Sequence, residues 1–145
     1  MNAAGAEKGF EVITDSSRIE ECDMVILCVG EHPYAEWYGD TRDLSIVGDM
    51  ALNGNKKAIE EALSSGKPTL TLIIAGRNVI IDEYLANWDS CIMCYLPGSE
   101  GGNAIADALT GNVTLTGTLP MPYYSSISQI GTGTYWHEAG WSALQ

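Results

Sequence analysis

The chain has 145 residues, of which 46% are hydrophobic and 18% are charged, and its formal net charge is −12. This length suits one domain with a hydrophobic core, so we expect a single domain over residues 1–145. The excess of acidic side chains repels phosphate groups, and no apolar run is long enough to cross a bilayer, so the sequence predicts neither a nucleic acid nor a membrane partner.

The first elements predicted along the chain are a short strand, a short helix and a buried strand. The apolar pair at 12–13 is followed by Asp15 and Ser16, and either of these residues can cap a helix. The apolar run 24–29 predicts a buried strand. A long loop then extends from residue 30 to about 52.

Helices and strands alternate after this loop. The pattern predicts a helix, a strand, a helix, a strand and a helix at 54–64, 69–74, 78–87, 90–95 and 101–109. The segment 69–74 is rich in β-branched residues and apolar on both faces in its second half, as in a strand that helices cover on both sides. We therefore expect an α/β fold, a three-layer α/β/α sandwich with a mostly parallel sheet.

The remainder of the chain, from about 112 to 145, has scattered glycine and proline residues between tyrosines and tryptophans. Such a composition does not sustain a regular helix, and it predicts an irregular, extended tail with one edge strand at most.

The four cysteines, Cys22, Cys28, Cys91 and Cys94, are interpreted as buried structural thiols. Cys91 and Cys94 have the spacing of a redox or zinc pair, but they lie in a segment that predicts a strand. Side chains three apart on a strand point to opposite faces, so these sulfurs are not expected to share a metal or a disulfide. We expect no metal and no cofactor.

A loop of carboxylates, aromatic side chains and an imidazole follows the buried strand at 24–29. Its sequence is Gly30-Glu31-His32-Pro33-Tyr34-Ala35-Glu36-Trp37-Tyr38-Gly39-Asp40. Open α/β sheets bind ligands beyond the carboxyl ends of their strands, and carboxylates and imidazoles transfer protons. The loop is therefore the candidate site, and the alternative interpretation is a solvated connection.

Several segments of the chain resemble the second domain of family-three glycoside hydrolases, which are β-glucosidases and related exo-acting enzymes. The loop carries the similarity in Gly30-Glu31-His32-Pro33-Tyr34, Gly39-Asp40 and Asp43-Leu44-Ser45. The same order continues in Gly66-Lys67-Pro68, in Ala75-Gly76-Arg77, in Leu96-Pro97-Gly98-Ser99-Glu100-Gly101-Gly102-Asn103-Ala104-Ile105-Ala106-Asp107 and in Gly117-Thr118-Leu119-Pro120. Compared with the family, the chain lacks the first strand of the sheet and the glycine-rich loop after it.

The resemblance implies hydrolysis of terminal β-glycosidic bonds by a retaining mechanism, with a β-linked oligosaccharide or glucoside as substrate. In the family the nucleophile is an aspartate of an N-terminal barrel domain, and the acid/base is a glutamate of the second-domain loop. Glu36 matches that glutamate. Glu31, at the end of the strand, is the second candidate for the acid/base. Its other interpretation is structural, since a carboxylate in a tight turn can hold the shape of the loop. Without the barrel, which is the expected partner, the isolated chain is expected to be inactive.

The other polar and aromatic residues of the loop have two interpretations each. Trp37 and Tyr38 suit the C–H face of a pyranose, or they pack the loop onto the missing barrel. His32 either reaches a sugar hydroxyl or supports the loop. Arg42 is expected to pair with a neighbouring aspartate and to fix the loop.

Two other functions fit parts of the sequence. One is a non-catalytic carbohydrate-binding or domain-assembly module of the same fold. The other is a flavodoxin-like nucleotide or cofactor binder, but the segment 98–103 matches neither phosphate-binding glycine motif. The sequence assigns no compartment, because its start has neither the basic region nor the apolar stretch of a signal peptide. A soluble chain is expected, and the resemblance is compatible with a secreted or periplasmic parent enzyme.

Overall fold

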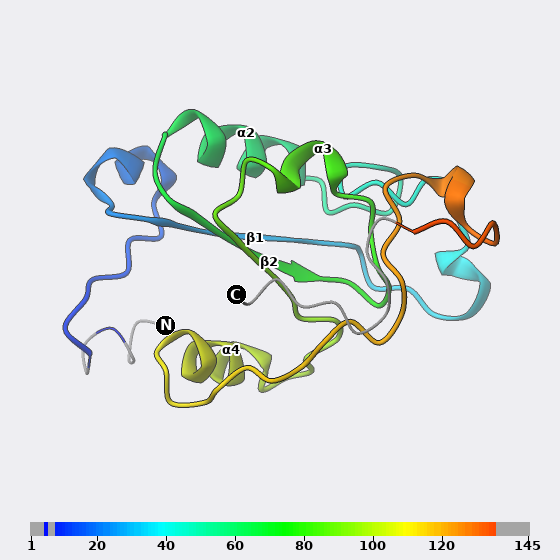
Figure 1. Cartoon of the computed structure of the whole chain (residues 1–145). Coiled ribbons are helices and arrows are strands. Elements are labelled where there is room, and N and C mark those ends of the chain that lie inside the picture. The colour runs from blue at the N-terminus through cyan, green and yellow to red at the C-terminus, as the bar shows by residue number, and fades with distance from the viewer. Residues whose placement is uncertain (1–4, 6–7, 136–145) are drawn as a thin grey trace.

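A three-stranded sheet lies between two layers of helices (Figure 1). The computed structural model describes residue 5 and residues 8–135. The strands are β1 (Val25–Gly30), β2 (Thr69–Ile74) and β3 (Ser90–Met93), in the order β1-β2-β3 and all parallel. The helices α2 (Asn55–Ser64) and α3 (Asp82–Leu85) lie on one side of the sheet, and α4 (Gly101–Leu109) lies on the other. The predicted α/β sandwich with a parallel sheet is confirmed.

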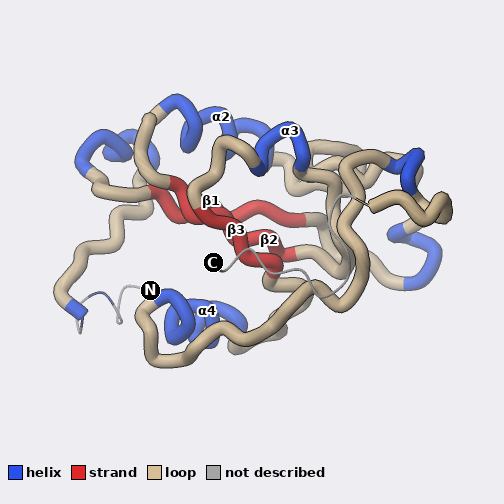
Figure 2. The backbone as a smooth tube through the Cα atoms, viewed as in Figure 1, coloured by secondary structure: helices blue, strands red, loops and turns tan. Residues whose placement is uncertain are grey.

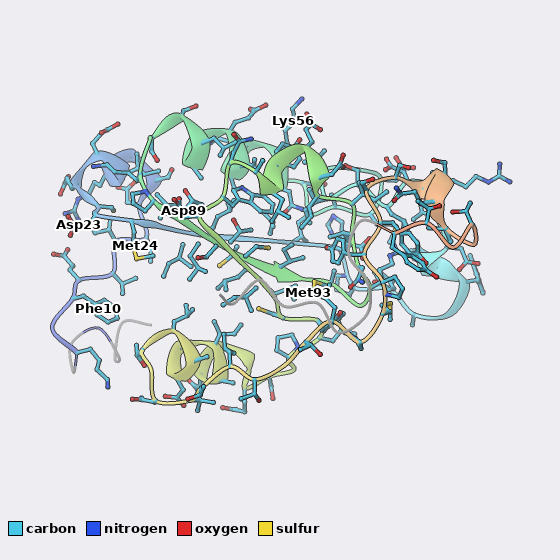
Figure 3. The ribbon with its side chains drawn as sticks, in the orientation of Figure 1. Phe10, Asp23, Met24, Lys56, Asp89 and Met93 are labelled. Atoms are coloured by element: carbon cyan, nitrogen blue, oxygen red, sulfur yellow. The ribbon has the colours of Figure 1, made fainter. Side chains whose placement is uncertain are left out.

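Figure 2 shows the three strands side by side, so that their carboxyl ends lie at one edge. The last residue of β1, Gly30, is paired with Ile74, the last residue of β2. At the opposite edge the Oδ2 atom of Asp89, labelled in Figure 3, accepts a hydrogen bond of 2.8 Å from the backbone N–H of Thr69. This contact fixes the start of β3 beside the start of β2.

The hydrophobic core lies between the sheet and the layer of α2 and α3. The strands contribute alternate residues, because successive side chains of a strand point to opposite faces. The helix α2 contributes Ile59 and Ala62, which are three residues apart and therefore share one face, whereas Lys56 points into solvent (Figure 3). The core cluster comprises Leu27, Val29, Ile46, Ile59, Ala62, Ile73, Ala75, Val79, Ile81, Trp88 and Tyr123.

The helix predicted over 78–87 is much shorter in the structure, where only α3 is helical. The residues before α3 are extended, because Ile80 pairs with the loop that follows β1. Its N–H donates to the carbonyl of Leu44 (2.7 Å), and its carbonyl accepts from the N–H of Ile46 (3.1 Å). This long-range pairing overrides the local helix pattern. It also attaches the candidate loop to the core.

Two other predicted elements differ from the structure. The strand predicted over 90–95 ends at Met93, and Tyr95 adopts a left-handed conformation (φ 53°) that a strand does not allow. Residues 12–13 lie outside the strands of the described chain, and the helix after them is the 3-10 helix η1 (Ser16–Glu21). Its cap is Asp15, whose Oδ1 accepts from the N–H of Ser17 (3.0 Å).

The part of the tail that the structure describes extends from residue 112 to residue 135 and is irregular. Between residues 112 and 135 it forms the 3-10 helix η3 (Ile127–Gln129) and contains no strand of the sheet. Tyr123 anchors it, because its side chain is buried in the core cluster. Within residue 5 and residues 8–135, no helix is long and apolar enough to cross a membrane.

The four cysteines are free thiols, and none of them is fully buried, in contrast to the expectation. Cys22, Cys91 and Cys94 are half-buried, whereas Cys28 is exposed on β1. Cys91 packs against the core cluster, and this burial, followed by the nearby Cys94, raises its pKa to about 12. Partial desolvation by neighbouring side chains also raises the pKa values of Cys94 and of the exposed Cys28.

We expect the Cys91 thiol to react slowly with iodoacetamide at pH 8, because the thiolate is the reactive form. A pKa of about 12 leaves roughly one thiol in ten thousand ionised at that pH. Peptide mapping by mass spectrometry should give alkylation at least about 100-fold slower in the folded chain than in concentrated urea. Equal rates in the two conditions would contradict the buried environment.

The close approach of β1 and β2 requires glycine at position 30. A Cβ atom on this residue would overlap the carbonyl oxygen of Ile74, which belongs to the backbone and cannot rotate away. We expect Gly30→Ala to lower the free energy of unfolding by about 1–3 kcal/mol, measured by urea denaturation. Gly102→Ala is the control, because no atom lies within 4 Å of its Cβ position. A Gly30→Ala variant as stable as this control would show that the strands separate at no cost.

Candidate functional site

The candidate site is the loop that leaves the sheet at the carboxyl end of β1. In Figure 1 this end lies on the right, where the 3-10 helix η2 (Glu36–Gly39, cyan) and η3 (orange) are also found. Glu31 directly follows β1, and Glu36 is the first residue of η2. The five predicted residues therefore lie on one loop, as a pair at 31–32 and a triplet at 36–38 on either side of the turn around Tyr34.

Glu31 forms a buried ion pair with Arg77, which lies in the loop after β2. Its side chain is 1% exposed, and that of Arg77 is 25% exposed. The Nη2 atom of Arg77 donates to Oε1 (2.8 Å), and its Nε lies 3.2 Å from both carboxylate oxygens. Buried charges are tolerated when they are paired and hydrogen-bonded in this way. The geometry thus favours the structural alternative for Glu31, which holds the turn.

Tyr34 completes this buried cluster. Its hydroxyl donates to Oε2 of Glu31 (2.9 Å) and accepts from the backbone N–H of Gly76 (3.1 Å). Burial, followed by the hydrogen bond to Glu31, raises the pKa of Tyr34, so the hydroxyl keeps its proton and remains a donor. The guanidinium carbon of Arg77 lies 4.7 Å from the centre of the Tyr34 ring. Tyr34 therefore contacts both partners of the ion pair, Glu31 through its hydroxyl and Arg77 through its ring.

Two glycines leave the space that the Tyr34 side chain occupies. A Cβ atom on Gly39 would lie 2.6 Å from Cδ2 of the ring, and one on Gly76 would lie 2.8 Å from the hydroxyl oxygen. Both distances are shorter than real Cβ contacts. Packing against Tyr34 thus explains why glycine occupies positions 39 and 76, which lie in segments that resemble the family.

The other end of the loop is fastened by Asn55, the first residue of α2. Its buried amide Nδ2 donates to the carbonyls of Gly30 and Ile46, each at 2.7 Å, and its Oδ1 accepts from the N–H of Gly30 (3.3 Å). The backbone of His32 also pairs with Met50 (2.9 Å). These bonds close the base of the loop and leave its tip, around η2, to project from the sheet.

The tip of the loop presents two aromatic side chains to solvent. Trp37 is 73% exposed and Tyr38 is 71% exposed, and their ring centres are 5.7 Å apart with planes inclined by 47°. His32 is also exposed. Exposed aromatic rings with polar edges can bind a sugar face or a second protein surface. The exposure of Trp37 and Tyr38 therefore fits either predicted role.

The arginine that fixes the loop is Arg77, and the expectation for Arg42 is wrong. Arg42 is exposed, and among the described residues it forms no ion pair with an aspartate. Asp43 instead accepts a hydrogen bond from the N–H of Ser45 (3.0 Å) and shapes a turn. The sequence draws attention to Arg77 only through the Ala75-Gly76-Arg77 segment, which resembles the family. This resemblance does not indicate that Arg77 pairs with Glu31.

The segment 98–103, considered above as a phosphate-binding loop, forms a turn into α4. Gly98 has a positive φ of 72°, and the Nδ2 atom of Asn103 donates to the carboxylate of Glu100 (2.9 Å). A carboxylate at this place repels an anion. In the part of the chain that the structure describes, no group of three or more His, Cys, Asp or Glu residues is arranged to hold a metal ion.

Comparison with known proteins gives consistent results for sequence and structure. The sequence model described as "Glycosyl hydrolase family 3 C-terminal domain" matches residues 11–142. The lysosomal beta glucosidase of Dictyostelium discoideum is 33% identical over 120 residues, which are 82% of this chain and 14% of that protein. A beta-xylosidase of Formosa agariphila is 29% identical over 115 residues, which are 79% of this chain and 15% of that protein. The chain thus spans only a small part of the length of these relatives.

Solved structures have the same fold. The β-glucosidase of Listeria innocua in complex with glucose superposes with a TM-score of 0.66 at 24% identity, over 79% of this chain and 15% of that one. The β-D-glucoside glucohydrolase of Trichoderma reesei superposes with a TM-score of 0.68 at 18% identity, over 86% of this chain and 19% of that one.

Proposed function

Because the chain belongs to the glycosyl hydrolase family 3 C-terminal domain family, we propose that it is the acid/base domain of a two-domain β-glycosidase. In this proposal residues 1–145 form one domain, Glu36 is the acid/base, and the nucleophile belongs to an N-terminal barrel domain. The substrates are terminal β-linked glucosides or related glycosides, since the named relatives are β-glucosidases and a β-xylosidase.

The mechanism that follows is the retaining one, in which two carboxyl groups act in turn. The glutamic acid form of Glu36 donates its proton to the glycosidic oxygen while the barrel nucleophile attacks the anomeric carbon and the leaving sugar departs. The resulting Glu36 carboxylate then takes a proton from water, and this water releases the sugar from the nucleophile with net retention. Trp37 and Tyr38 bind the sugar beyond the cleaved bond.

The main support for this proposal is the position of Glu36 at the start of η2, on the projecting tip of a loop whose base is fastened to the core. A residue that serves a site completed by another domain has to lie on such a tip of the loop. Glu31 lacks this property, because both of its oxygens are bonded to Arg77 or Tyr34 and its side chain is buried. Residues 1–145 by themselves are expected to hydrolyse nothing, because in this proposal the nucleophile belongs to another domain.

Complementation with a barrel domain tests the proposal. The barrel domain of the Dictyostelium discoideum relative, the chain alone and an equimolar mixture or fusion of the two are assayed with p-nitrophenyl β-glucoside and with cellobiose. We expect turnover only when both parts are present. Turnover by the chain alone would contradict a site shared between two domains.

The same materials distinguish the alternative functions. Calorimetric titration of the chain with cellobiose that reveals binding, combined with no hydrolysis in any mixture, would identify a non-catalytic carbohydrate-binding module. Flavin absorbance in the purified chain would instead support the cofactor-binding alternative.

A further inference from the structure

We propose that Arg77 is a positioning residue for η2, because its guanidinium ties both ends of the turn on which Glu36 lies. The catalytic consequence rests on the proposed function, whereas the effect on the loop can be tested without it. Arg77 itself is not assigned a contact with substrate.

The contacts of Arg77 bracket the segment between Glu31 and Gly39. Nε and Nη2 bind the Glu31 carboxylate at the start of the loop, with a shortest distance of 2.8 Å. Nη1 donates to the carbonyl of Gly39, the last residue of η2, at 2.6 Å. One rigid, planar group therefore sets the separation between the end of β1 and the end of η2.

Arg77 is itself anchored to the core, so it acts from a fixed place. It lies between Ala75, which is 1% exposed, and Val79, which is fully buried. Both residues belong to the core cluster that packs the sheet against α2 and α3. A displacement of the guanidinium thus requires either a change of its rotamer or a disturbance of the core.

Among the residues whose side chains the structure describes, few other contacts hold the tip of the loop in one conformation. Within η2 the backbone bonds are Tyr38 N–H to Ala35 (3.2 Å) and Asp40 N–H to Trp37 (3.0 Å). The two large side chains of η2 point into solvent and bury little area. Short segments with few buried contacts open locally at low free energy. The polar contacts of Arg77 therefore decide the order of this turn.

Tyr34 lies between Arg77 and η2 and contacts both. Its ring lies against the guanidinium and against Gly39, where a side chain would overlap the ring. Gly39→Ala consequently disturbs the turn from the opposite side while it leaves the Glu31–Arg77 pair chemically intact. This variant separates loop positioning from the loss of a charge.

Hydrogen exchange of the full chain, followed by mass spectrometry, tests the inference directly. Arg77→Lys keeps the charge but cannot bind Glu31 and Gly39 at the same time, because an ammonium lacks the fork of donors. We expect amides of residues 34–40 to exchange about 10- to 100-fold faster than in the unmodified chain. Amides of β2 should keep their protection, and Gly39→Ala should accelerate the same amides.

Arg42→Lys is the matched control, since it makes the same chemical change at an exposed arginine of the same loop region. Its exchange should equal that of the unmodified chain. Unchanged exchange at 34–40 in both Arg77→Lys and Gly39→Ala would overturn the inference. Equal acceleration by Arg42→Lys would also overturn it, because the effect would then not depend on the contacts of Arg77.

Kinetics of the chain complemented with the barrel domain test the catalytic part. We expect Arg77→Ala to lower kcat for cellobiose by about 100-fold with a smaller change in KM, because the proton donor is misplaced rather than removed. Ethylguanidinium should restore part of kcat, whereas ethylammonium should not. Arg77→Lys, which keeps the buried charge paired, provides the same comparison if the alanine variant does not fold.

Failure of this inference differs from failure of the proposed function. If hydrolysis requires Glu36 and yet Arg77→Lys retains full kcat, the positioning role is wrong and the acid/base role stands. If Glu36 itself is dispensable for cellobiose hydrolysis, the proposed function is wrong, and the exchange experiment still decides whether Arg77 orders the turn.

Discussion

Glu36→Gln in the complemented enzyme is expected to lower kcat for cellobiose by about 10²- to 10⁴-fold, which is the usual contribution of general acid catalysis. The amide of glutamine has nearly the same shape as the acid but cannot donate a proton to the leaving sugar. p-Nitrophenol leaves without protonation, so the first step with p-nitrophenyl β-glucoside should be much less affected. The measurement is steady-state hydrolysis of the two substrates by the same preparation.

Two further observations make this prediction specific for an acid/base. The variant should lose the fall in activity toward high pH that deprotonation of a general acid produces. Azide, which attacks without help from a base, should accelerate turnover of the aryl glucoside. Glu60→Gln, an exposed carboxylate of α2, is the control and should behave as the unmodified chain. Cellobiose hydrolysis that survives in Glu36→Gln would contradict the assignment.

Arg77→Met is expected to lower the free energy of unfolding by about 3–5 kcal/mol, since it leaves the buried carboxylate of Glu31 without its partner. The side chain of Glu31 is 1% exposed, so solvent cannot replace the lost contacts. Methionine preserves much of the apolar stem of arginine, and the loss therefore reports the charge and its hydrogen bonds. Urea denaturation followed by circular dichroism measures the difference.

The control for this variant is Arg42→Met, which removes an exposed arginine and should change the stability by less than about 0.5 kcal/mol. A double-mutant cycle with Glu31→Gln isolates the pair, because the second change should cost little once the partner is gone. Additive effects of the two substitutions would show that Glu31 and Arg77 do not interact in solution. High salt should alter the result little, since the Glu31 carboxylate is shielded from solvent.

The elements that sequence patterns predicted best are those whose signals are local. Residues 69–74 and 101–109 form β2 and α4 with the predicted bounds, because β-branched alternation and helix-stopping glycine act within a few residues. The predicted helix over 78–87 was wrong in its first part, where Ile80 pairs with Leu44 and Ile46. No local pattern contains that pairing, which spans more than thirty residues of chain.

The candidate loop also combines features that local sequence signals predict with features that only long-range contacts decide. Its location after the first buried strand, its carboxylates and its aromatic pair are readable from the residues, whereas the exposure of Trp37 and Tyr38 is known only from the structure. The sequence does not show which of the two glutamates is buried. Glu31 and Glu36 are equivalent in composition, and only the position of Arg77, 46 residues from Glu31, distinguishes the buried one.

The sequence by itself determined the fold class and the family, because strand and helix periods and short collinear motifs are encoded in neighbouring residues. It also determined the edge of the sheet at which the candidate loop lies, since parallel strands bring their carboxyl ends together. Only the tertiary structure decided that Arg77 rather than Arg42 fixes the loop and that Glu31 is buried. The reason is physical: an ion pair depends on distance and desolvation in three dimensions, and residues far apart in the chain meet only when the sheet has formed.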